Sequence, residues 1–320
     1  MPSPPVPRSP FPSMTIFESI LLGIIQGIFM FFPVSSTSHL VLTQHWLIQR
    51  GSSLPPPESA EMIFFDLIVH VGTLISIAVV FRRSLSRFLG QVWQDLRQLL
   101  SDWRSGQGNI KGLTPLLVPT EKREGDRLYL RLAILGVLSV FVTGLIGFPM
   151  RSLFKEVFAH PLAISVTLTI TGILLWYTDR QLRQPRGLRQ ITPWVATVIG
   201  IGQGLALMPG LSRSGMTISF ALFVGLKRQW AAEYSFFIAF PTILGATALQ
   251  LIEVIQADSL TIEFLPMFIG FLVAAGVGIV ALQIVLNFLY KARFRYFSYY
   301  LWVLAIIVAW GAISGQFTVV

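Results

Sequence analysis

Two short polar strings interrupt apolar stretches of this sequence, and both are made of residue types that bind anions. The first polar string is Pro33-Val-Ser-Ser-Thr-Ser-His39, and the second is Pro209-Gly-Leu-Ser-Arg-Ser-Gly-Met-Thr217. An arginine at membrane depth costs about 2.5–3.5 kcal/mol even on lenient insertion scales, so Arg213 is expected to face a cavity and to bind a negative group. Several hydroxyl groups beside one guanidinium are typical of a phosphate site.

The first string also contains a candidate nucleophile and a candidate base. Ser36 and His39 are three positions apart, so on a helical turn they share one face. A serine activated by a nearby histidine is a common nucleophile. The polar side chains expected around them are Gln26, Ser35, Thr37, Ser38, Gln203, Ser212, Ser214 and Thr217. These side chains have structural alternatives, because Ser and Thr in membrane helices often hydrogen-bond the preceding turn and the two glutamines could pair with each other.

The composition is that of a protein that crosses a membrane several times. The chain has 320 residues, of which 53% are hydrophobic and 12% are charged, and its mean hydropathy is +0.69. The net charge of +9 comes from Lys and Arg in loops between apolar segments, so it does not indicate a nucleic-acid partner. The absence of cysteine excludes disulfides, thiolate metal sites and cysteine nucleophiles.

The elements that must position the two strings are expected to be all α-helical. Residues 1–13 are rich in Pro and Ser and are predicted to be a disordered tail, whereas 14–320 are predicted to form a single membrane domain. Six membrane-spanning helices are predicted, at 61–81, 128–148, 161–178, 231–253, 264–288 and 297–315. The polar loop 82–127 begins with a segment of helical periodicity, 84–103, that is expected to lie along the membrane surface.

Each polar string is expected at the tip of a broken helical hairpin that enters and leaves the membrane on one side. Residues 14–32 and 40–48 flank the first string, and residues 191–208 and 211–226 flank the second. Polar residues and glycines interrupt the first pair, and Pro209-Gly210 breaks the second. This pattern favours two re-entrant hairpins over additional spans.

The distribution of basic residues predicts which loops face the cytoplasm. Loops 82–127, 179–190 and 289–296 carry an excess of Lys and Arg, whereas 254–263 has acidic residues and no basic one. Basic loops tend to remain on the cytoplasmic side. With this orientation the first hairpin starts and ends outside, and the second starts and ends inside.

The two hairpins repeat a common sequence pattern. Gly23-Ile-Ile-Gln-Gly27 recurs as Gly200-Ile-Gly-Gln-Gly204, and the same offset places Ser35 on Ser212. Such matches in the same order indicate a duplicated unit.

An odd number of predicted spans separates the hairpins, so the second repeat, about 191–315, is inverted relative to the first, about 15–178. Inverted repeats with broken helices place their polar tips together near the middle of the membrane. We therefore expect Ser35–His39 and Ser212–Thr217 to face each other in one cavity, with helix N-termini aimed into it.

With these residues the sequence resembles the undecaprenyl-diphosphate phosphatase family, the integral membrane type linked to bacitracin resistance. The resemblance rests on Phe32-Pro-Val-Ser-Ser-Thr-Ser-His39, on Val69-His-Val-Gly-Thr73 and on the second polar string, and it extends from about 15 to 315. It implies a bacterial inner-membrane enzyme of six spans plus re-entrant helices, with a site that opens outward. It also implies a polyprenyl diphosphate lipid as substrate, whose hydrolysis recycles the carrier for cell-wall synthesis. A homodimer is left open.

The resemblance also implies roles for individual residues. Ser36 matches the serine proposed as nucleophile, His39 matches the histidine proposed as base or proton shuttle, and Arg213 matches the diphosphate clamp. We therefore expect these three to be catalytic. The expected substrate-binding residues are Gln26, Ser35, Thr37, Ser212, Ser214 and Thr217.

One position departs from the family pattern. The family has Glu/Gln-x-x-x-Glu in its first hairpin, a motif linked to dependence on a divalent cation, and here Gln26 fits the first place but Met30 occupies the second. A thioether cannot replace a carboxylate as a ligand of a hard cation such as Mg²⁺ or Ca²⁺. Gln26 and Asp66 remain as candidate metal ligands.

Three functions compete at this point. The first is a lipid diphosphate phosphatase that acts at the outer leaflet. The second is a transporter or flippase of a polyprenyl phosphate, which an inverted repeat also suits. The third is a catalytically impaired homologue, because Met30 removes a metal ligand. The identity of the nucleophile, Ser36 or His39, is open as well.

Overall fold

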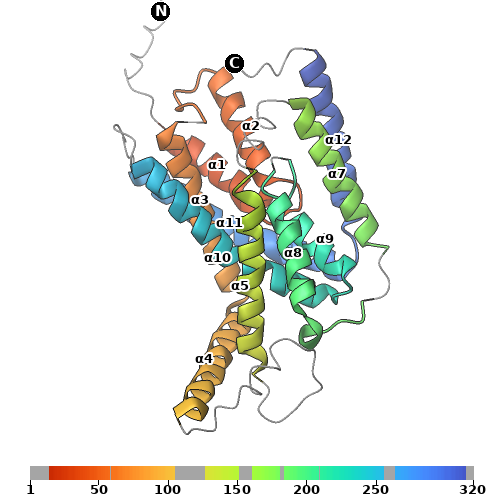
Figure 1. Cartoon of the computed structure of the whole chain (residues 1–320). Helices are drawn as coiled ribbons and strands as arrows, with labels where there is room; N and C mark the ends of the chain where they lie inside the picture. The colour runs from red at the N-terminus through yellow and green to blue at the C-terminus, as the bar shows by residue number, and fades with distance from the viewer. Residues whose placement is uncertain are drawn as a thin grey trace, which may run out of the picture.

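The chain folds as a bundle of α-helices. The computed structural model describes residues 14–57, 59–104, 127–150, 161–180, 184–208, 210–255 and 264–314. Figure 1 shows the helices gathered together, with α4 (Arg82–Arg104) extending from one end of the bundle. The predicted tail at 1–13, residues 105–126 of the predicted loop, and Pro209 lie outside the described residues.

Among the residues that the structure describes, five helices are long and apolar enough to cross a membrane. They are α3 (Ala60–Val80), α5 (Leu128–Gly147), α10 (Arg228–Ile255), α11 (Phe264–Tyr290) and α12 (Arg295–Ile313). The remaining predicted span is also an apolar helix, the shorter α7 (Pro161–Thr178). Every predicted span is therefore helical, and the chain has the helices of a multi-pass membrane protein.

The first polar string connects two short helices, α1 (Ile16–Phe29) and α2 (Ser36–Gln49). The Thr15 hydroxyl caps α1 by accepting a hydrogen bond from the Glu18 amide at 3.2 Å, and the Glu18 carboxylate accepts one from the Thr15 amide at 2.7 Å. The hydroxyl of Ser52, beyond the end of α2, donates to the same carboxylate at 2.5 Å. The start of α1 and the chain after α2 therefore lie next to each other.

The second polar string lies between α8 (Pro193–Leu205) and α9 (Arg213–Phe223). The chain before α8 and the chain after α9 are paired, because the Arg186 amide donates to the Gly225 carbonyl and the Lys227 amide donates to the Arg186 carbonyl, both at 3.0 Å. The two ends of this hairpin therefore also lie next to each other.

The two hairpins pack in equivalent ways on helices of the opposite half of the chain. The first packs through α1 on α11, where a Cβ atom added to Gly23 would lie 2.8 Å from the Gly270 carbonyl oxygen. The second packs through α8 on α5, where a Cβ atom added to Gly200 would lie 2.6 Å from the Ser139 carbonyl oxygen. Gly23 and Gly200 are counterparts in the sequence repeat. Each glycine permits a close helix contact that a larger residue would prevent.

The same correspondence holds one helical turn further along. A Cβ atom added to Gly27 would lie 2.9 Å from the Ala274 carbonyl oxygen, and one added to Gly204 would lie 3.3 Å from the Thr143 carbonyl oxygen. Both partners follow those of the first pair by one turn. The contacts of the two hairpins therefore correspond residue by residue.

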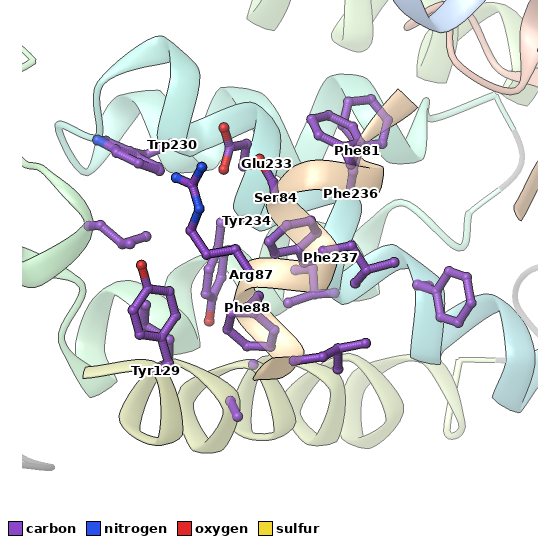
Figure 2. Close-up of a pocket in the computed structure, with 18 of the residues that line it drawn as sticks. Phe81, Ser84, Arg87, Phe88, Tyr129, Trp230, Glu233, Tyr234, Phe236 and Phe237 are labelled. Atoms are coloured by element: carbon purple, nitrogen blue, oxygen red, sulfur yellow. The ribbon is translucent and has the colours of Figure 1, made fainter. Parts of the chain in front are cut away.

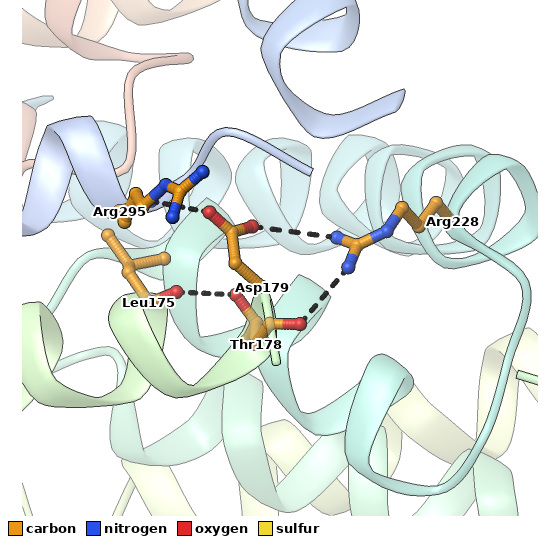
Figure 3. Close-up of polar contacts among 5 residues, drawn as sticks. All are labelled: Leu175, Thr178, Asp179, Arg228 and Arg295. Atoms are coloured by element: carbon orange, nitrogen blue, oxygen red, sulfur yellow. Dashed lines mark hydrogen bonds and ion pairs between the residues drawn. The ribbon is translucent and has the colours of Figure 1, made fainter. Parts of the chain in front are cut away.

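The distribution of basic residues predicts that three connections lie on one side of the membrane. These connections, which follow α7, precede α10 and precede α12, come together around Asp179 (Figure 3). One oxygen of its carboxylate accepts a hydrogen bond from the Arg295 amide at 2.8 Å, and the other lies 3.8 Å from Nη1 of Arg228. Arg228 also donates to the Thr178 carbonyl at 3.1 Å. The end of α7 and the starts of α10 and α12 therefore lie at the same end of the bundle.

Helix α4 is fastened to the start of α5. The Asp95 carboxylate accepts hydrogen bonds from the Tyr129 and Leu130 amides at 3.1 and 3.0 Å. It thereby caps the N-terminus of α5, because the side chain of the preceding residue, Arg127, forms no capping hydrogen bond. Arg127 instead forms an ion pair with Asp102 at 2.5 Å. The helix predicted at 84–103 is confirmed. Its exposed large apolar side chains are Leu89, Trp93, Leu100 and Trp103.

Candidate active site

The tips of the two hairpins touch each other. The Ser214 hydroxyl, on the first turn of α9, donates to the Phe31 carbonyl at 3.2 Å. A Cβ atom added to Gly215 would lie 3.2 Å from Cβ of Pro33. Gly210 has a φ of +85°, a conformation that glycine adopts without a steric penalty, and it allows the chain to turn before α9. The structure therefore joins segments that lie 183 residues apart in the sequence.

Met30, directly after α1, lies where these tips meet and is contacted by three hydrogen-bond donors. Its sulfur lies 3.5 Å from Nε2 of Gln26, 3.6 Å from Nη2 of Arg213 and 4.0 Å from the Ser36 hydroxyl. A thioether is only a weak acceptor. In the described part of the chain, Oε1 of Gln26 is buried without a hydrogen-bond partner. The donors therefore converge on a point where an anionic oxygen would be a better acceptor than the sulfur.

His39 is oriented by three neighbours. Its Nδ1 lies 2.8 Å from the Ser35 carbonyl oxygen, its Nε2 lies 2.6 Å from the Tyr300 hydroxyl, and the Phe29 ring stacks on it at a centroid distance of 3.9 Å. Both ring nitrogens are thus engaged, and no hydrogen bond joins His39 to Ser36 among the residues described. Tyr300 comes from α12 and was not found from the sequence, because nothing distinguishes it from the other tyrosines of that span.

The two helices that start at the tips begin differently. Ser35, before α2, has a left-handed φ of 67°, which is uncommon for a residue other than glycine, and its side chain does not cap the helix. The Ser212 hydroxyl caps α9 by accepting a hydrogen bond from the Gly215 amide at 3.2 Å. The N-terminus of α2 therefore keeps backbone N–H groups for an anion.

Several predicted binding residues have local hydrogen-bond partners. The Thr217 hydroxyl donates to the Arg213 carbonyl at 2.8 Å within α9, and the Ser35 and Ser38 hydroxyls lie 3.1 Å apart. Thr37 is exposed on the first turn of α2. The substrate contacts assigned to these side chains stay predictions.

Gln203, the repeat counterpart of Gln26, has a different role. Its Nε2 donates to the hydroxyls of Thr143 and Thr242 at 3.2 and 2.8 Å. Gln26 contacts Met30 instead, so the alternative in which the two glutamines pair is wrong.

Helix α3 contributes an ionisable group next to Arg213. The Arg213 guanidinium interacts electrostatically with His70, whose Nδ1 donates to the Asp66 carbonyl at 2.6 Å. The Asp66 carboxylate accepts a hydrogen bond from Nε2 of Gln44 at 3.1 Å. Asp66, a candidate metal ligand, therefore joins α3 to α2.

The side chains around Met30 do not fit a divalent metal ion. Hard cations select carboxylate and carbonyl oxygens, whereas this group offers a sulfur, one amide and a hydroxyl beside the positive charge of Arg213. Within the described ranges, no group of three His, Cys, Asp or Glu residues could hold a metal ion. The observed donor set therefore suits an anion better than a cation.

Comparison with known proteins identifies the family of this chain. A family model described as bacitracin resistance protein BacA matches residues 19–307. The undecaprenyl-diphosphatase of Alkalilimnicola ehrlichii is 55% identical over 306 residues, which cover 94% of this chain and 98% of that protein. The undecaprenyl-diphosphatase of Halorhodospira halophila is 51% identical over 93% of this chain and 98% of its own length. The undecaprenyl-diphosphatase of Carboxydothermus hydrogenoformans is 31% identical over 95% of this chain and 100% of its own length. The chain therefore belongs to the family of the bacitracin resistance protein BacA.

Proposed function

We propose that this chain hydrolyses undecaprenyl diphosphate to undecaprenyl phosphate and inorganic phosphate, and thereby recycles the lipid carrier of cell-wall synthesis and contributes to bacitracin resistance. Its membership of the family and the shared name of its relatives support this activity. The observation that carries it is the convergence of Arg213, Gln26 and Ser36 on one point between the two hairpin tips.

Arg213 is proposed to bind the diphosphate. A guanidinium matches two phosphate oxygens at once, and the uncapped N-terminus of α2 adds N–H donors and the positive end of a helix dipole. Phosphoryl transfer depends mainly on positioning and on stabilising the charge of the transferred group, which these donors provide. The substrate phosphate takes the place of the Met30 sulfur as their acceptor.

Ser36 is proposed as the nucleophile, because its hydroxyl already lies at the point of convergence. Its oxygen would bond to the terminal phosphorus while the bond from that phosphorus to the bridging oxygen breaks, and undecaprenyl phosphate leaves. Water then hydrolyses the phosphoserine. His39 is proposed to move the protons in both steps, and to do so Nε2 must exchange the Tyr300 hydroxyl for the reacting groups.

No divalent cation is assigned a step in this scheme. The expectation of bound Mg²⁺ or Ca²⁺ came from the family motif, and the donor set around Met30 does not fit either ion. Arg213 and the helix N-terminus are proposed to provide the positive charge instead.

In the membrane, we propose six spans, with α7 as the sixth, and two re-entrant hairpins from an inverted repeat. The adjacent ends of each hairpin and the matched glycine contacts support this arrangement. The protein is proposed to lie in the bacterial inner membrane, with the active site open to the outer face.

The activity is tested by giving the purified chain undecaprenyl diphosphate and identifying products by phosphorus NMR. The proposal expects undecaprenyl phosphate and inorganic phosphate in equal amounts. A polyprenyl-phosphate flippase remains the second candidate, since the matched packing of the two halves also suits alternating access. Lipid translocation in vesicles that persists in Ser36→Ala would favour that candidate.

A further inference from the structure

A cavity of about 450 Å³ lies between the end of α3, the start of α4, α5 and α10 (Figure 2). No residue of the four hairpin helices is among those that line it. Its volume is within the range of small-ligand sites, roughly 300–1,000 Å³. The cavity is therefore separate from the active site, and no step of the proposed reaction uses it.

The inner wall of the cavity is aromatic and preformed. Phe81 and Phe236 are almost fully buried, with a ring-centroid distance of 5.6 Å, and Phe237 lies within 6.0 Å of Phe81 and 5.6 Å of Phe88. The Tyr234 hydroxyl, also in the wall, is already bonded to the Leu135 carbonyl at 3.0 Å. Because this hydroxyl is satisfied and most of the lining residues are apolar, the interior suits a hydrocarbon better than a polar ligand.

Two opposite charges line one end of the cavity. Arg87 of α4 is exposed and interacts electrostatically with Glu233 of α10, and Figure 2 shows both at the same end. Nε2 of Gln229 donates to the Glu233 carboxylate at 3.2 Å. No hydrogen bond or ion pair at contact distance joins Arg87 to Glu233 in the part of the chain described. A group carrying both charges can therefore bind between them.

The charged end lies near the junction between the apolar helix α3 and the amphipathic helix α4. The spanning helix α3 ends at Val80 and α4 begins at Arg82, and the cavity is lined on both sides of this junction. Tyr129 and Trp230 also line it, and tyrosine and tryptophan are typical of the membrane–water interface. An apolar interior among candidate spans and a charged end at this junction match the hydrocarbon and headgroup regions of a lipid.

We propose that this cavity binds one hydrocarbon chain of a membrane phospholipid whose headgroup carries both a phosphate and a primary ammonium, as in phosphatidylethanolamine. Arg87 binds the phosphate, and Glu233, held by Gln229, binds the ammonium. A headgroup with a phosphate and no ammonium would leave Glu233 beside a like charge, so the site discriminates against anionic phospholipids.

Native mass spectrometry of the purified full chain tests this site. The protein is titrated with dioleoyl phosphatidylethanolamine, dioleoyl phosphatidylglycerol and dioleoylglycerol, each at the same concentration. We expect the phosphatidylethanolamine adduct to form with roughly tenfold higher affinity than either of the others. Glu233→Gln should abolish the preference over phosphatidylglycerol, and Arg87→Gln should abolish the preference over dioleoylglycerol. Equal affinity for the three lipids, or preference for phosphatidylglycerol, would overturn the proposal.

A filled cavity provides the matched control. A Cβ atom at Gly136 would meet only Ile238, at 3.8 Å, so the side chain of Gly136→Leu can extend into the space it lines. Gly144, on the same helix, has open space around it, and Gly144→Leu adds the same side chain outside the cavity. We expect Gly136→Leu to lower the affinity for phosphatidylethanolamine by roughly tenfold and Gly144→Leu to leave it unchanged.

The thermal unfolding midpoint shows whether each variant is folded. Binding raises the midpoint, so added phosphatidylethanolamine should stabilise the wild type and Gly144→Leu but not Gly136→Leu. Should Gly136→Leu fail to fold, the decision rests on Arg87→Gln and Glu233→Gln, whose side chains are at the charged end of the cavity. Retention of the wild-type lipid preference by both would overturn the proposal. None of these readouts depends on phosphatase activity.

Discussion

The hydroxyl of Tyr300 lies 2.6 Å from Nε2 of His39 and joins α12 to the first turn of α2. On the opposite side of the ring, Nδ1 lies 2.8 Å from the Ser35 carbonyl oxygen. A carbonyl only accepts, so Nδ1 carries the proton and Nε2 of the neutral ring accepts from the tyrosine. Tyr300 therefore fixes the orientation and the tautomer of the residue proposed to move protons in the reaction.

Replacing Tyr300 with phenylalanine keeps the ring and removes the hydrogen bond. Tyr300 holds His39 in place until the reacting groups replace the tyrosine at Nε2, so without it the imidazole would be less well oriented. We therefore expect kcat for phosphate release to fall by about tenfold, less than the loss of a general acid or base would cause, with KM little changed. Tyr299→Phe is the matched control, since Tyr299 is exposed and packs on Trp302 instead. An unchanged kcat in Tyr300→Phe, or an equal loss in the control, would contradict the assigned role.

Replacing Met30 with glutamate places a carboxylate among Gln26, Ser36 and Arg213. The wild type is expected to keep its rate in EDTA, because its donors do not fit a divalent cation. Met30→Glu should bind Ca²⁺ in calorimetry, and its rate should fall on chelation. Met30→Leu, which conserves the side-chain volume, should neither bind Ca²⁺ nor lose activity on chelation. A wild type that loses activity in EDTA and regains it with Mg²⁺ would show that this account of the site is wrong.

Glycine-to-alanine changes test the matched packing of the two hairpins. Gly23→Ala and Gly200→Ala would each place a methyl group within 3.0 Å of a backbone oxygen of the facing helix. We expect each to destabilise the protein by about 1–3 kcal/mol, the usual cost of overpacking, and to lower the unfolding midpoint in detergent. Gly276→Ala, which has open space around it, is the control. Midpoints equal to that of the control would argue against close packing at these positions.

The apolar helices and the breaks between them could be predicted because hydropathy and helix breakers act locally along the chain. The span predicted at 61–81 is α3 at Ala60–Val80, and the break predicted around Gly210 separates α8 from α9. The start of α2 was predicted less well. Its apolar part was expected at 40–48, but the helix begins at Ser36. The polar residues of its first turn contribute nothing to a hydropathy signal, although they are the ones closest to the active site.

The contacts between helices could not be predicted from the same pattern. Tyr300 and His39 are 261 residues apart, and α12 contains other tyrosines at similar spacing, so no local signal selects this one. Met30 was recognised as a departure from the family motif. Its contact with Arg213 arises only when the second hairpin tip meets the first. The candidate site residues could therefore be named from the sequence, and their roles stay predictions, whereas their hydrogen-bond partners depend on packing.

The central claim is that Arg213 binds the diphosphate where the two hairpin tips meet, and phosphate release by purified protein tests it most directly. We expect Arg213→Ala to lower kcat/KM about 10²–10³-fold, the usual cost of removing one donor to the transition state. Arg213→Lys should recover only part of this, since an ammonium lacks the planar fork of the guanidinium. Arg97→Ala is the control, because Arg97 is exposed on α4 and lies over the ring of Trp93. This variant should retain wild-type activity. Release of phosphate from undecaprenyl diphosphate by Arg213→Ala at the wild-type rate, or no release by the folded wild type, would contradict the account.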